Sequence, residues 1–287
     1  MKALLAAALL AAGAPAVAQD VKATDDAGQT LTLPRPAQRV ISLAPHLTEL
    51  AFAAGGGAAV VGVMRYSDYP EAATRLPVVG DAFALNFEAI AKLKPDLVLV
   101  WGSGLNDRQK TQLRALGLPV FESEIRDVEG IARTLRTLGT LMGTSPAADL
   151  VAREVERNWA ALRAMYAQRK PVRVFFQLWR EPLMTVNREH VISRAIEACG
   201  GRNVFAQLPA LTPTVSWEAA VQSNPQLLVT AGSKVEPADF GRWREFSRVD
   251  AVKRQRLAVI DGNLLGRMGP RFVQGAAQLC EAIDAGR

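Results

Sequence analysis

The stretch that decides the fold is Asn86-Phe-Glu-Ala-Ile-Ala-Lys-Leu-Lys-Pro-Asp-Leu-Val-Leu-Val-Trp-Gly-Ser103, whose pattern returns 130 residues later as Ser216-Trp-Glu-Ala-Ala-Val-Gln-Ser-Asn-Pro-Gln-Leu-Leu-Val-Thr-Ala-Gly-Ser233. In each copy a helix-capping Asn or Ser precedes an aromatic residue, and a glutamate follows in the first turn. A proline then ends the helix, and an apolar strand leads to Gly-Ser. Six of the eighteen positions are identical. A spacing this long does not suit a solenoid and indicates two lobes of similar design.

Strand and helix signals alternate around both copies. Short apolar runs predict buried strands at residues 39–44, 60–64, 97–100, 120–121 and 172–177. The periodic segments between them predict helices at residues 48–54, 107–116 and 128–142. The predicted fold class is therefore α/β, with two similar lobes that each contain a mostly parallel sheet flanked by helices.

One long helix is predicted between the copies, over residues 145–170. Ser145 is a suitable cap, Pro146 suits the first helical position, and Pro171 ends the helix. Its apolar stripe consists of Val151, Val155, Trp159, Leu162 and Tyr166. At about 35 to 40 Å it would span two lobes and restrict their relative movement. An ordinary amphipathic helix inside one domain is the alternative.

The N-terminus, MKALLAAALLAAGAPAVAQD, has the features of a secretory signal peptide. A lysine precedes a short apolar run, and Ala16-Val17-Ala18 forms a small-x-small cleavage pattern. No later segment has the roughly 20 uninterrupted apolar residues of a membrane helix. We expect a soluble protein outside the cytoplasm, with a signal peptide at 1–18, an N-terminal lobe at 19–144, a linking helix at 145–170 and a C-terminal lobe at 171–287.

Cysteine usage and charge restrict the function further. In an exported chain, Cys199 and Cys280 predict one disulfide within the C-terminal lobe, worth about 4 kcal/mol by loop entropy, and two buried thiols are the alternative. The net charge of +6 is spread along the chain without a basic run, which disfavours nucleic-acid binding. With only two histidines, we expect no metal-ion site.

Several motifs carry a family resemblance. In the first lobe these are Ser67-Asp-Tyr-Pro70, Leu93-Lys-Pro-Asp-Leu-Val98 with Trp101, and Asn106-Asp-Arg-Gln109. In the second lobe they are Glu197-Ala-Cys-Gly-Gly-Arg-Asn-Val-Phe205 and the segment 270–280. The chain thereby resembles the periplasmic cobalamin-binding proteins that feed ABC importers. These form a branch of the helical-linker binding proteins that also includes siderophore and haem binders.

The resemblance implies a transport protein and no enzyme. A corrinoid would be held unchanged between the lobes, as a transported ligand and not a cofactor, by a periplasmic protein expected to be monomeric.

Glu88 and Glu218 would dock on arginines of the permease in the inner membrane. A carboxylate in a first turn also gains about 0.3 to 1 kcal/mol from the helix dipole. That alternative explains either glutamate singly but not the presence of both.

The resemblance also implies a ligand site. Tyr66, Trp101 and Arg267 match cleft positions, and Tyr69 and Phe83 lie nearby in sequence. Flat rings pack against a macrocycle, and an arginine can donate to its peripheral amides. For the aromatics, core packing is the alternative.

Two further residues complete the predicted site. Met184, Ala82 and Thr212 stand at positions where the best-known relative presents aromatic rings in the cleft. Near the last strand, an acidic cluster of that relative is replaced by Asn263 and Gly266. His46 lies where the first strand meets its helix, the usual ligand-facing edge of such sheets. It would either approach the ligand or hydrogen-bond within its own loop.

Two rival functions remain open. A ferric-siderophore or haem carrier would share the lobes and gather arginines, for which the candidates are Arg65, Arg108, Arg180 and Arg267. An exported hydrolase would need a triad such as Ser42, His46 and Asp68. The chain has no Gly-x-Ser-x-Gly elbow, His-Glu-x-x-His helix or phosphate loop, which disfavours the hydrolase.

Overall fold

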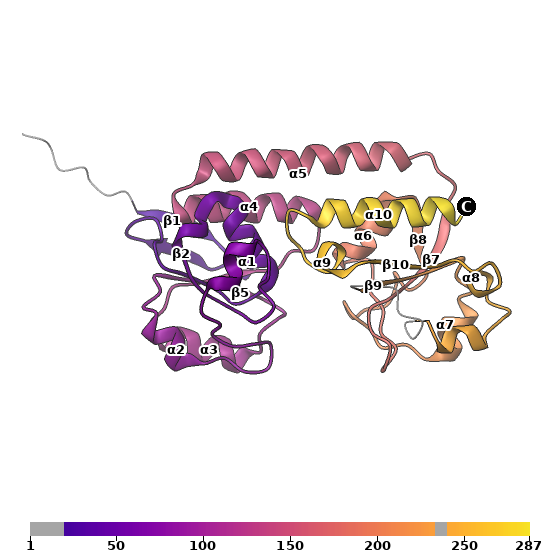
Figure 1. The fold of residues 1–287 in the computed structure, drawn as a ribbon, viewed down its shortest axis with the longest axis horizontal. Coiled ribbons are helices and arrows are strands. Elements are labelled where there is room, and N and C mark those ends of the chain that lie inside the picture. The colour runs from indigo at the N-terminus through magenta and orange to yellow at the C-terminus, as the bar shows by residue number, and fades with distance from the viewer. Residues whose placement is uncertain (1–19, 233–239) are drawn as a thin grey trace, which may run out of the picture.

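The computed structural model describes residues 20–232 and 240–287. It consists of two lobes, each built on a four-stranded parallel sheet, and one long helix, α5 (Ser145–Tyr166), that runs along both (Figure 1). The predicted fold class is confirmed. The predicted signal peptide, residues 1–18, lies outside the described residues.

The N-terminal lobe has a parallel sheet in the order β4-β3-β5-β6. Its strands are β3 (Val40–Ser42), β4 (Val60–Val63), β5 (Leu97–Trp101) and β6 (Val120–Ser123). Its helices are α1 (Pro45–Ala51), α2 (Phe87–Lys92), α3 (Asp107–Ala115) and α4 (Val128–Met142). The antiparallel hairpin of β1 (Val21–Thr24) and β2 (Thr30–Leu33) was not predicted, because both short strands alternate apolar with polar residues and contain no continuous apolar run.

The C-terminal lobe has a parallel sheet in the order β10-β9-β7-β8. Its strands are β7 (Val172–Gln177), β8 (Gly201–Asn203), β9 (Leu227–Gly232) and β10 (Leu257–Asp261). Its helices are α6 (Val191–Ala198), α7 (Trp217–Gln222), α8 (Asp250–Lys253), α9 (Gly262–Leu265) and α10 (Phe272–Ala285). Counted along the chain within each lobe, both sheets have the strand order 2-1-3-4.

The repeated stretch forms the same structure twice, α2 with β5 and α7 with β9. Asn86 and Ser216 are the helix caps, and each side chain accepts a hydrogen bond from the backbone amide three residues later. Between helix and strand, Lys94 and Asn224 both have left-handed backbones, with φ of 47° and 40°. This agreement extends the match beyond sequence and confirms that the two lobes share one design.

The linking helix α5 begins after a tight turn. Gly143, with φ of 70°, ends α4, and a Cβ atom there would lie 3.0 Å from Pro36. Ser145 is the first helical residue and not the cap, and the helix ends at Tyr166 and not at residue 170, so that it is about 33 Å long. Of the predicted stripe, Val155, Trp159 and Tyr166 are buried, and Val151 and Leu162 are partly buried.

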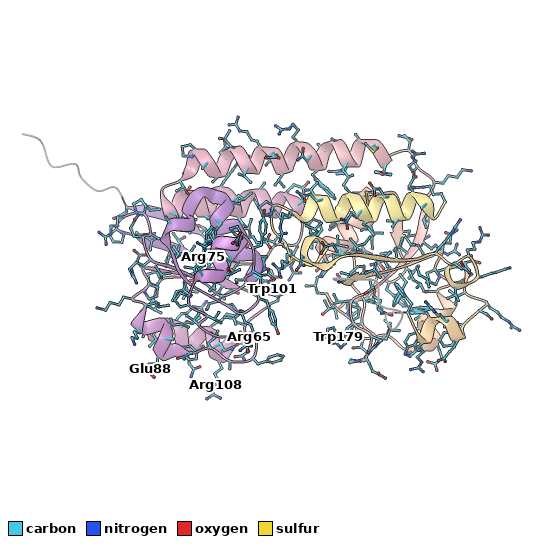
Figure 2. All side chains as sticks on the ribbon, viewed as in Figure 1. Arg65, Arg75, Glu88, Trp101, Arg108 and Trp179 are labelled. Carbon is cyan, nitrogen blue, oxygen red and sulfur yellow. A yellow bond between two sulfur atoms is a disulfide. The ribbon has the colours of Figure 1, made fainter. Side chains whose placement is uncertain are left out.

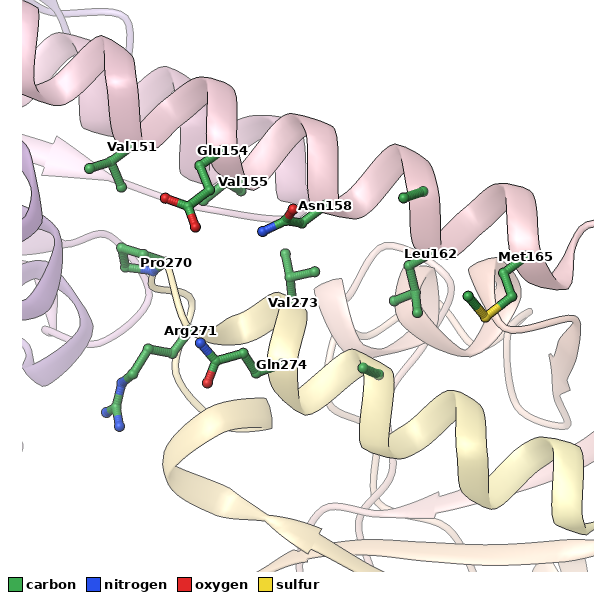
Figure 3. Close-up of a pocket in the computed structure, with 12 residues that line it drawn as sticks. Val151, Glu154, Val155, Asn158, Leu162, Met165, Pro270, Arg271, Val273 and Gln274 are labelled. Carbon is green, nitrogen blue, oxygen red and sulfur yellow. The ribbon is translucent and has the colours of Figure 1, made fainter.

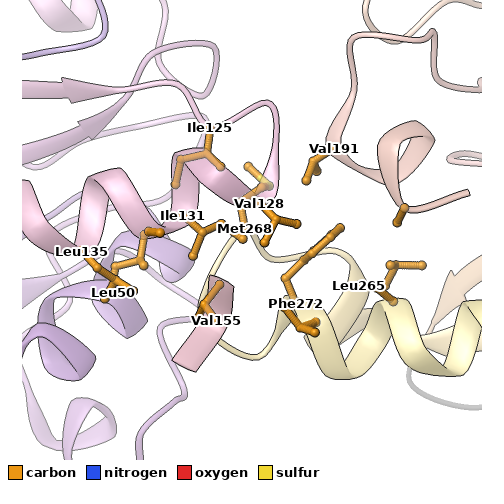
Figure 4. Packing of buried hydrophobic residues seen from close by; sticks show 14 of the residues in the cluster. Leu50, Ile125, Val128, Ile131, Leu135, Val155, Val191, Leu265, Met268 and Phe272 are labelled. Carbon is orange, nitrogen blue, oxygen red and sulfur yellow. The ribbon is translucent and has the colours of Figure 1, made fainter. Parts of the chain in front are cut away.

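Hydrophobic packing joins the lobes alongside α5. Val155 on α5 belongs to one continuous core with Val128 of α4 and with Met268 and Phe272 of the C-terminal lobe (Figure 4). The linking helix is thus packed against both lobes, against α4 at one end and α10 at the other. The alternative of a helix packed within one domain is therefore wrong.

The predicted disulfide is present. Cys199 follows α6 and Cys280 lies within α10, so the bond joins two helices of one lobe across a separation of 81 residues. Both cysteines are buried.

Loss of this disulfide is expected to lower the free energy of unfolding by about 4 kcal/mol, because the crosslink restricts the unfolded chain. The Cys199→Ser, Cys280→Ser double variant and the wild type are compared by urea denaturation, with and without reductant. Reductant should lower the stability of the wild type to that of the variant. A wild type that is insensitive to complete reduction, as verified by thiol alkylation, would contradict the expectation.

Candidate ligand-binding site at the carboxyl ends of the strands

The N-terminal lobe has a pocket of about 390 Å³ at the carboxyl ends of β3, β4 and β5. In a sheet of order 2-1-3-4, the chain passes from the first strand to its neighbour on one side and then crosses to its neighbour on the other side. Ligands bind in the crevice where the strand order reverses in this way. The residues that line it include Ala44, Met64, Arg65, Tyr66, Phe83 and Trp101. Three of the predicted ligand residues, Tyr66, Phe83 and Trp101, are therefore brought together.

Tyr66 and Phe83 expose their rings at this pocket, with exposed fractions of 73% and 92%. The backbone of Tyr66 is left-handed, with φ of 68°, a conformation that is rare for an aromatic residue and typical of functional sites. The carboxylate of Asp81 accepts hydrogen bonds from the amides of Phe83 (3.0 Å) and Ala84 (3.1 Å), and these bonds hold its pKa below the usual range. Core packing does not account for either ring.

His46 lies behind Trp101 and does not line the pocket. It is in the first turn of α1, it is buried, and its ring meets that of Trp101 edge-on, with centroids 5.3 Å apart. Burial, and secondarily the charge of Arg267, lower the pKa of His46 to about 3, so that the imidazole is neutral at pH 7. Within the described part of the chain, His46 Nε2 and Trp101 Nε1 are buried without a hydrogen-bond partner.

Arg267 and Tyr69 lie outside this pocket, in contacts that bridge the lobes. Arg267 donates to Glu49 (3.1 Å) and Asp68 (2.5 Å), and Arg271 donates to the same Glu49 (2.7 and 3.0 Å). The guanidinium of Arg271 stacks 3.6 Å above the ring of Tyr69. We call Glu49, Asp68, Arg267 and Arg271 the interlobe ion cluster.

The interlobe ion cluster is well shielded from water at its centre. The Glu49 side chain is 1% exposed, and it is the shared acceptor of both arginines. The hydrogen bond from Arg267 lowers the pKa of Asp68. Sequence reasoning missed the contact between Glu49 and Arg271 because the two residues are 222 positions apart. Arg271 lies in the segment 270–280 that carries the family resemblance, but no role was predicted for it.

The C-terminal lobe has a corresponding pocket of about 390 Å³ at the carboxyl ends of β7 and β9. Gln177, Trp179, Arg180 and Thr230 contribute to its wall. Met184 is half-buried and pairs with Trp179 through backbone hydrogen bonds, but it does not line the pocket. Trp179 was not predicted, although an aromatic residue two positions after a buried strand was a usable signal.

The two pockets belong to facing sides of the lobes. Figure 2 shows Trp101 and Arg65 at the side of the N-terminal lobe that faces the C-terminal lobe, with Trp179 on the opposite side of the gap. Of the other arginines considered for a siderophore, Arg180 lines the second pocket, whereas Arg108 lies on α3, away from the gap. The four candidate arginines are therefore not gathered in one pocket.

A further groove of about 430 Å³ lies between α5 and α10 (Figure 3). Its walls include Val151, Leu162 and Met165 of the linking helix and Val273 of α10. None of the predicted ligand residues lines it, so it is distinct from the candidate site.

The two glutamates of the repeat are exposed and occupy equivalent places. Glu88 in α2 and Glu218 in α7 each lie in a first helical turn, on the side of the molecule away from α5 (Figure 1). The pKa of Glu218 is lowered by its own backbone amide and by the Ser216 side chain. Neither glutamate is part of the two pockets.

The candidate hydrolase triad is not assembled. Ser42 is buried and accepts a hydrogen bond from Thr48 (2.9 Å), while Asp68 is paired with Arg267.

Within residues 20–232 and 240–287, no group of three or more His, Cys, Asp or Glu residues is placed to hold a metal ion. In the same residues no helix is both long and apolar enough to cross a membrane.

Comparisons with known proteins agree with this architecture. The sequence profile of a family described as periplasmic binding protein matches residues 40–264. The vitamin B12-binding protein of Vibrio cholerae is 34% identical over 251 residues, which are 87% of this chain and 90% of that protein. The vitamin B12-binding protein of Yersinia pestis is 36% identical over 258 residues, which are 88% and 89% of the two chains.

Solved structures resemble the whole two-lobed chain. The crystal structure of the periplasmic vitamin B12 binding protein of Vibrio cholerae has a TM-score of 0.80 at 32% identity, and the match covers 88% of this chain and 98% of that one. A periplasmic heme-binding protein from Roseiflexus has a TM-score of 0.77 at 26% identity, with 88% and 100% covered. The chain belongs to the periplasmic binding protein family, and vitamin B12-binding proteins are among its relatives.

Proposed function

We propose that this periplasmic protein captures cobalamin or a related corrinoid between its two lobes and delivers it to the permease of an ABC importer. The observation that carries the proposal is the pair of facing pockets, one of which is lined by the exposed rings of Tyr66 and Phe83. Exposed flat rings favour a macrocycle with a flat face, and dispersed arginines disfavour a compact anionic siderophore. The similarity to vitamin B12-binding proteins supports the same ligand.

A second part of the proposal concerns the partner. Glu88 and Glu218 would dock on arginines of the permease, since both are exposed on one side of the molecule and neither belongs to a pocket.

The protein would act as a soluble monomer that binds one ligand and does not change it chemically. The core and the interlobe ion cluster would keep domain movement small.

Isothermal titration of the purified protein with cyanocobalamin, haem and a ferric siderophore tests the ligand. We expect 1:1 binding of cyanocobalamin, and about tenfold weaker binding by the Tyr66→Ala and Phe83→Ala variants, because each loses one stacking surface. Leu150→Ala, an exposed position on α5, is the matched control and should bind as the wild type does. Absence of heat with cyanocobalamin would overturn the corrinoid assignment, and binding of haem alone would replace it with the heme-carrier alternative.

A further inference from the structure

The loop after β7 holds a tryptophan in a fixed position. Residues 178–184 form a tight hairpin, in which the amide of Leu178 donates to Met184 O (2.9 Å) and the amide of Met184 donates to Trp179 O (3.0 Å). Next to its base, Thr185 Oγ1 donates to Phe176 O (2.8 Å) and ties the hairpin to the strand. The position of Trp179 is therefore set by the sheet.

The indole ring of Trp179 is oriented but not covered. Its Nε1 donates to the carbonyl oxygen of Glu181 (3.0 Å), which satisfies the only polar group of the ring. The residue is nevertheless 63% exposed. A large apolar surface left in water at the wall of a pocket is typical of a ligand contact. Because the ring is already held in place, little conformational entropy is lost when a ligand binds to it.

The other aromatic residues of this lobe are used differently. Trp243 is fully buried, and Trp217 packs against it and against Phe246. Among the described residues 172–232 and 240–287, Trp179 is the one large hydrophobic side chain that is highly exposed. Met184 has no ring, and its hairpin partner Trp179 does.

The facing lobe supplies the complementary surface. Tyr66 and Phe83 are exposed at the N-terminal pocket, and Trp179 lies across the gap from that side of the lobe (Figure 2). We propose that Trp179 forms the C-terminal wall of the ligand site and stacks on the flat ligand opposite Tyr66 and Phe83. The inference rests on the proposed function and adds to it a residue that determines affinity from the second lobe.

Titration of the full-length mature protein with cyanocobalamin tests the inference. Trp179→Ala is expected to weaken binding by about ten- to hundredfold, and Trp179→Phe, which keeps a flat ring, by less than about fivefold. Met165→Ala is the control, because Met165 is similarly exposed but lies on α5 at the separate groove. All variants should keep the wild-type circular dichroism spectrum and thermal midpoint, since Trp179 is outside the core.

The outcomes separate the inference from the proposed function. If the wild type binds cyanocobalamin and Trp179→Ala binds equally well, the inference is overturned while the proposed function stands. If the wild type does not bind, the proposed function is overturned, and the inference with it. If Trp179→Ala and Trp179→Phe are equally weakened, the role of the residue is not stacking and the inference is also overturned.

Discussion

Replacement of Glu49 by alanine is expected to lower the free energy of unfolding by about 3 kcal/mol, because it leaves a shielded ion cluster without its shared acceptor. Glu49 is the shared acceptor of Arg267 and Arg271, and its side chain is 1% exposed. Without Glu49, the largely buried guanidinium groups of Arg267 and Arg271 would have only the Asp68 carboxylate in the cluster, and Asp68 pairs with Arg267 alone. Urea denaturation of wild type and variant measures the difference.

A matched control shows whether burial causes the effect. Glu71 and Arg75 form an ion pair 3.6 Å long on the surface, where the Glu71 side chain is 88% exposed. Glu71→Ala should change stability by less than about 0.5 kcal/mol, because exposed ion pairs contribute little. Equal effects of the two substitutions would mean that the interlobe ion cluster does not hold the lobes together.

Acidification should weaken the same cluster. The pKa of Asp68 is lowered in the folded protein by its hydrogen bond with Arg267, so its contribution to stability is present above its ordinary pKa and is lost as pH falls through the lowered value. Asp68 is more than half exposed, and water screens its share of the interaction.

Reversal of charge at both Glu88 and Glu218 to arginine is expected to abolish uptake while ligand affinity stays unchanged. At the proposed contact, each arginine would face an arginine of the permease, and like charges in an interface cost several kcal/mol, or more than about a hundredfold in affinity. Uptake of labelled cyanocobalamin into cells that depend on this binding protein measures the effect, and calorimetry measures ligand binding in parallel.

The control for this experiment is Glu71→Arg, which makes one such charge reversal at an exposed position outside α2 and α7. It should leave uptake near the wild-type level. Normal uptake by the double variant would remove the docking proposal. Loss of ligand binding would instead assign Glu88 and Glu218 to the site or to the core.

Most of the fold was predictable from local sequence. Buried parallel strands are continuous apolar runs, so β3, β4, β5 and β7 were found within one or two residues of their bounds. The periodic segment 128–142 predicted α4, and Pro146 located the beginning of α5 to within one residue, although Thr144 and not Ser145 is the cap. The hairpin of β1 and β2 and the short strand β8 were missed because none of these strands contains a continuous apolar run.

The site was predictable only in part. Tyr66 follows β4 and Trp101 ends β5, so both lie at the carboxyl-end edge of the sheet, a consequence of topology that the alternation already implied. Phe83 joins them from the loop before α2, which the strand pattern did not locate. Arg267 was expected at the ligand, but its guanidinium is held by Glu49 and Asp68. Trp179 was overlooked although its place two residues after β7 was a usable signal, and its exposure depends on the hairpin that carries it.

The sequence by itself determined the two-lobed α/β architecture, the doubled glutamate-bearing element and the pairing of Cys199 with Cys280, because propensity, capping and cysteine usage are local or compositional properties. Only the tertiary structure decided which charges meet between the lobes and which rings remain uncovered. Both depend on residues that are distant in sequence and adjacent in space, as Glu49 and Arg271 are across 222 positions. Burial then determines whether such a contact is a weak surface pair or a strong link between lobes.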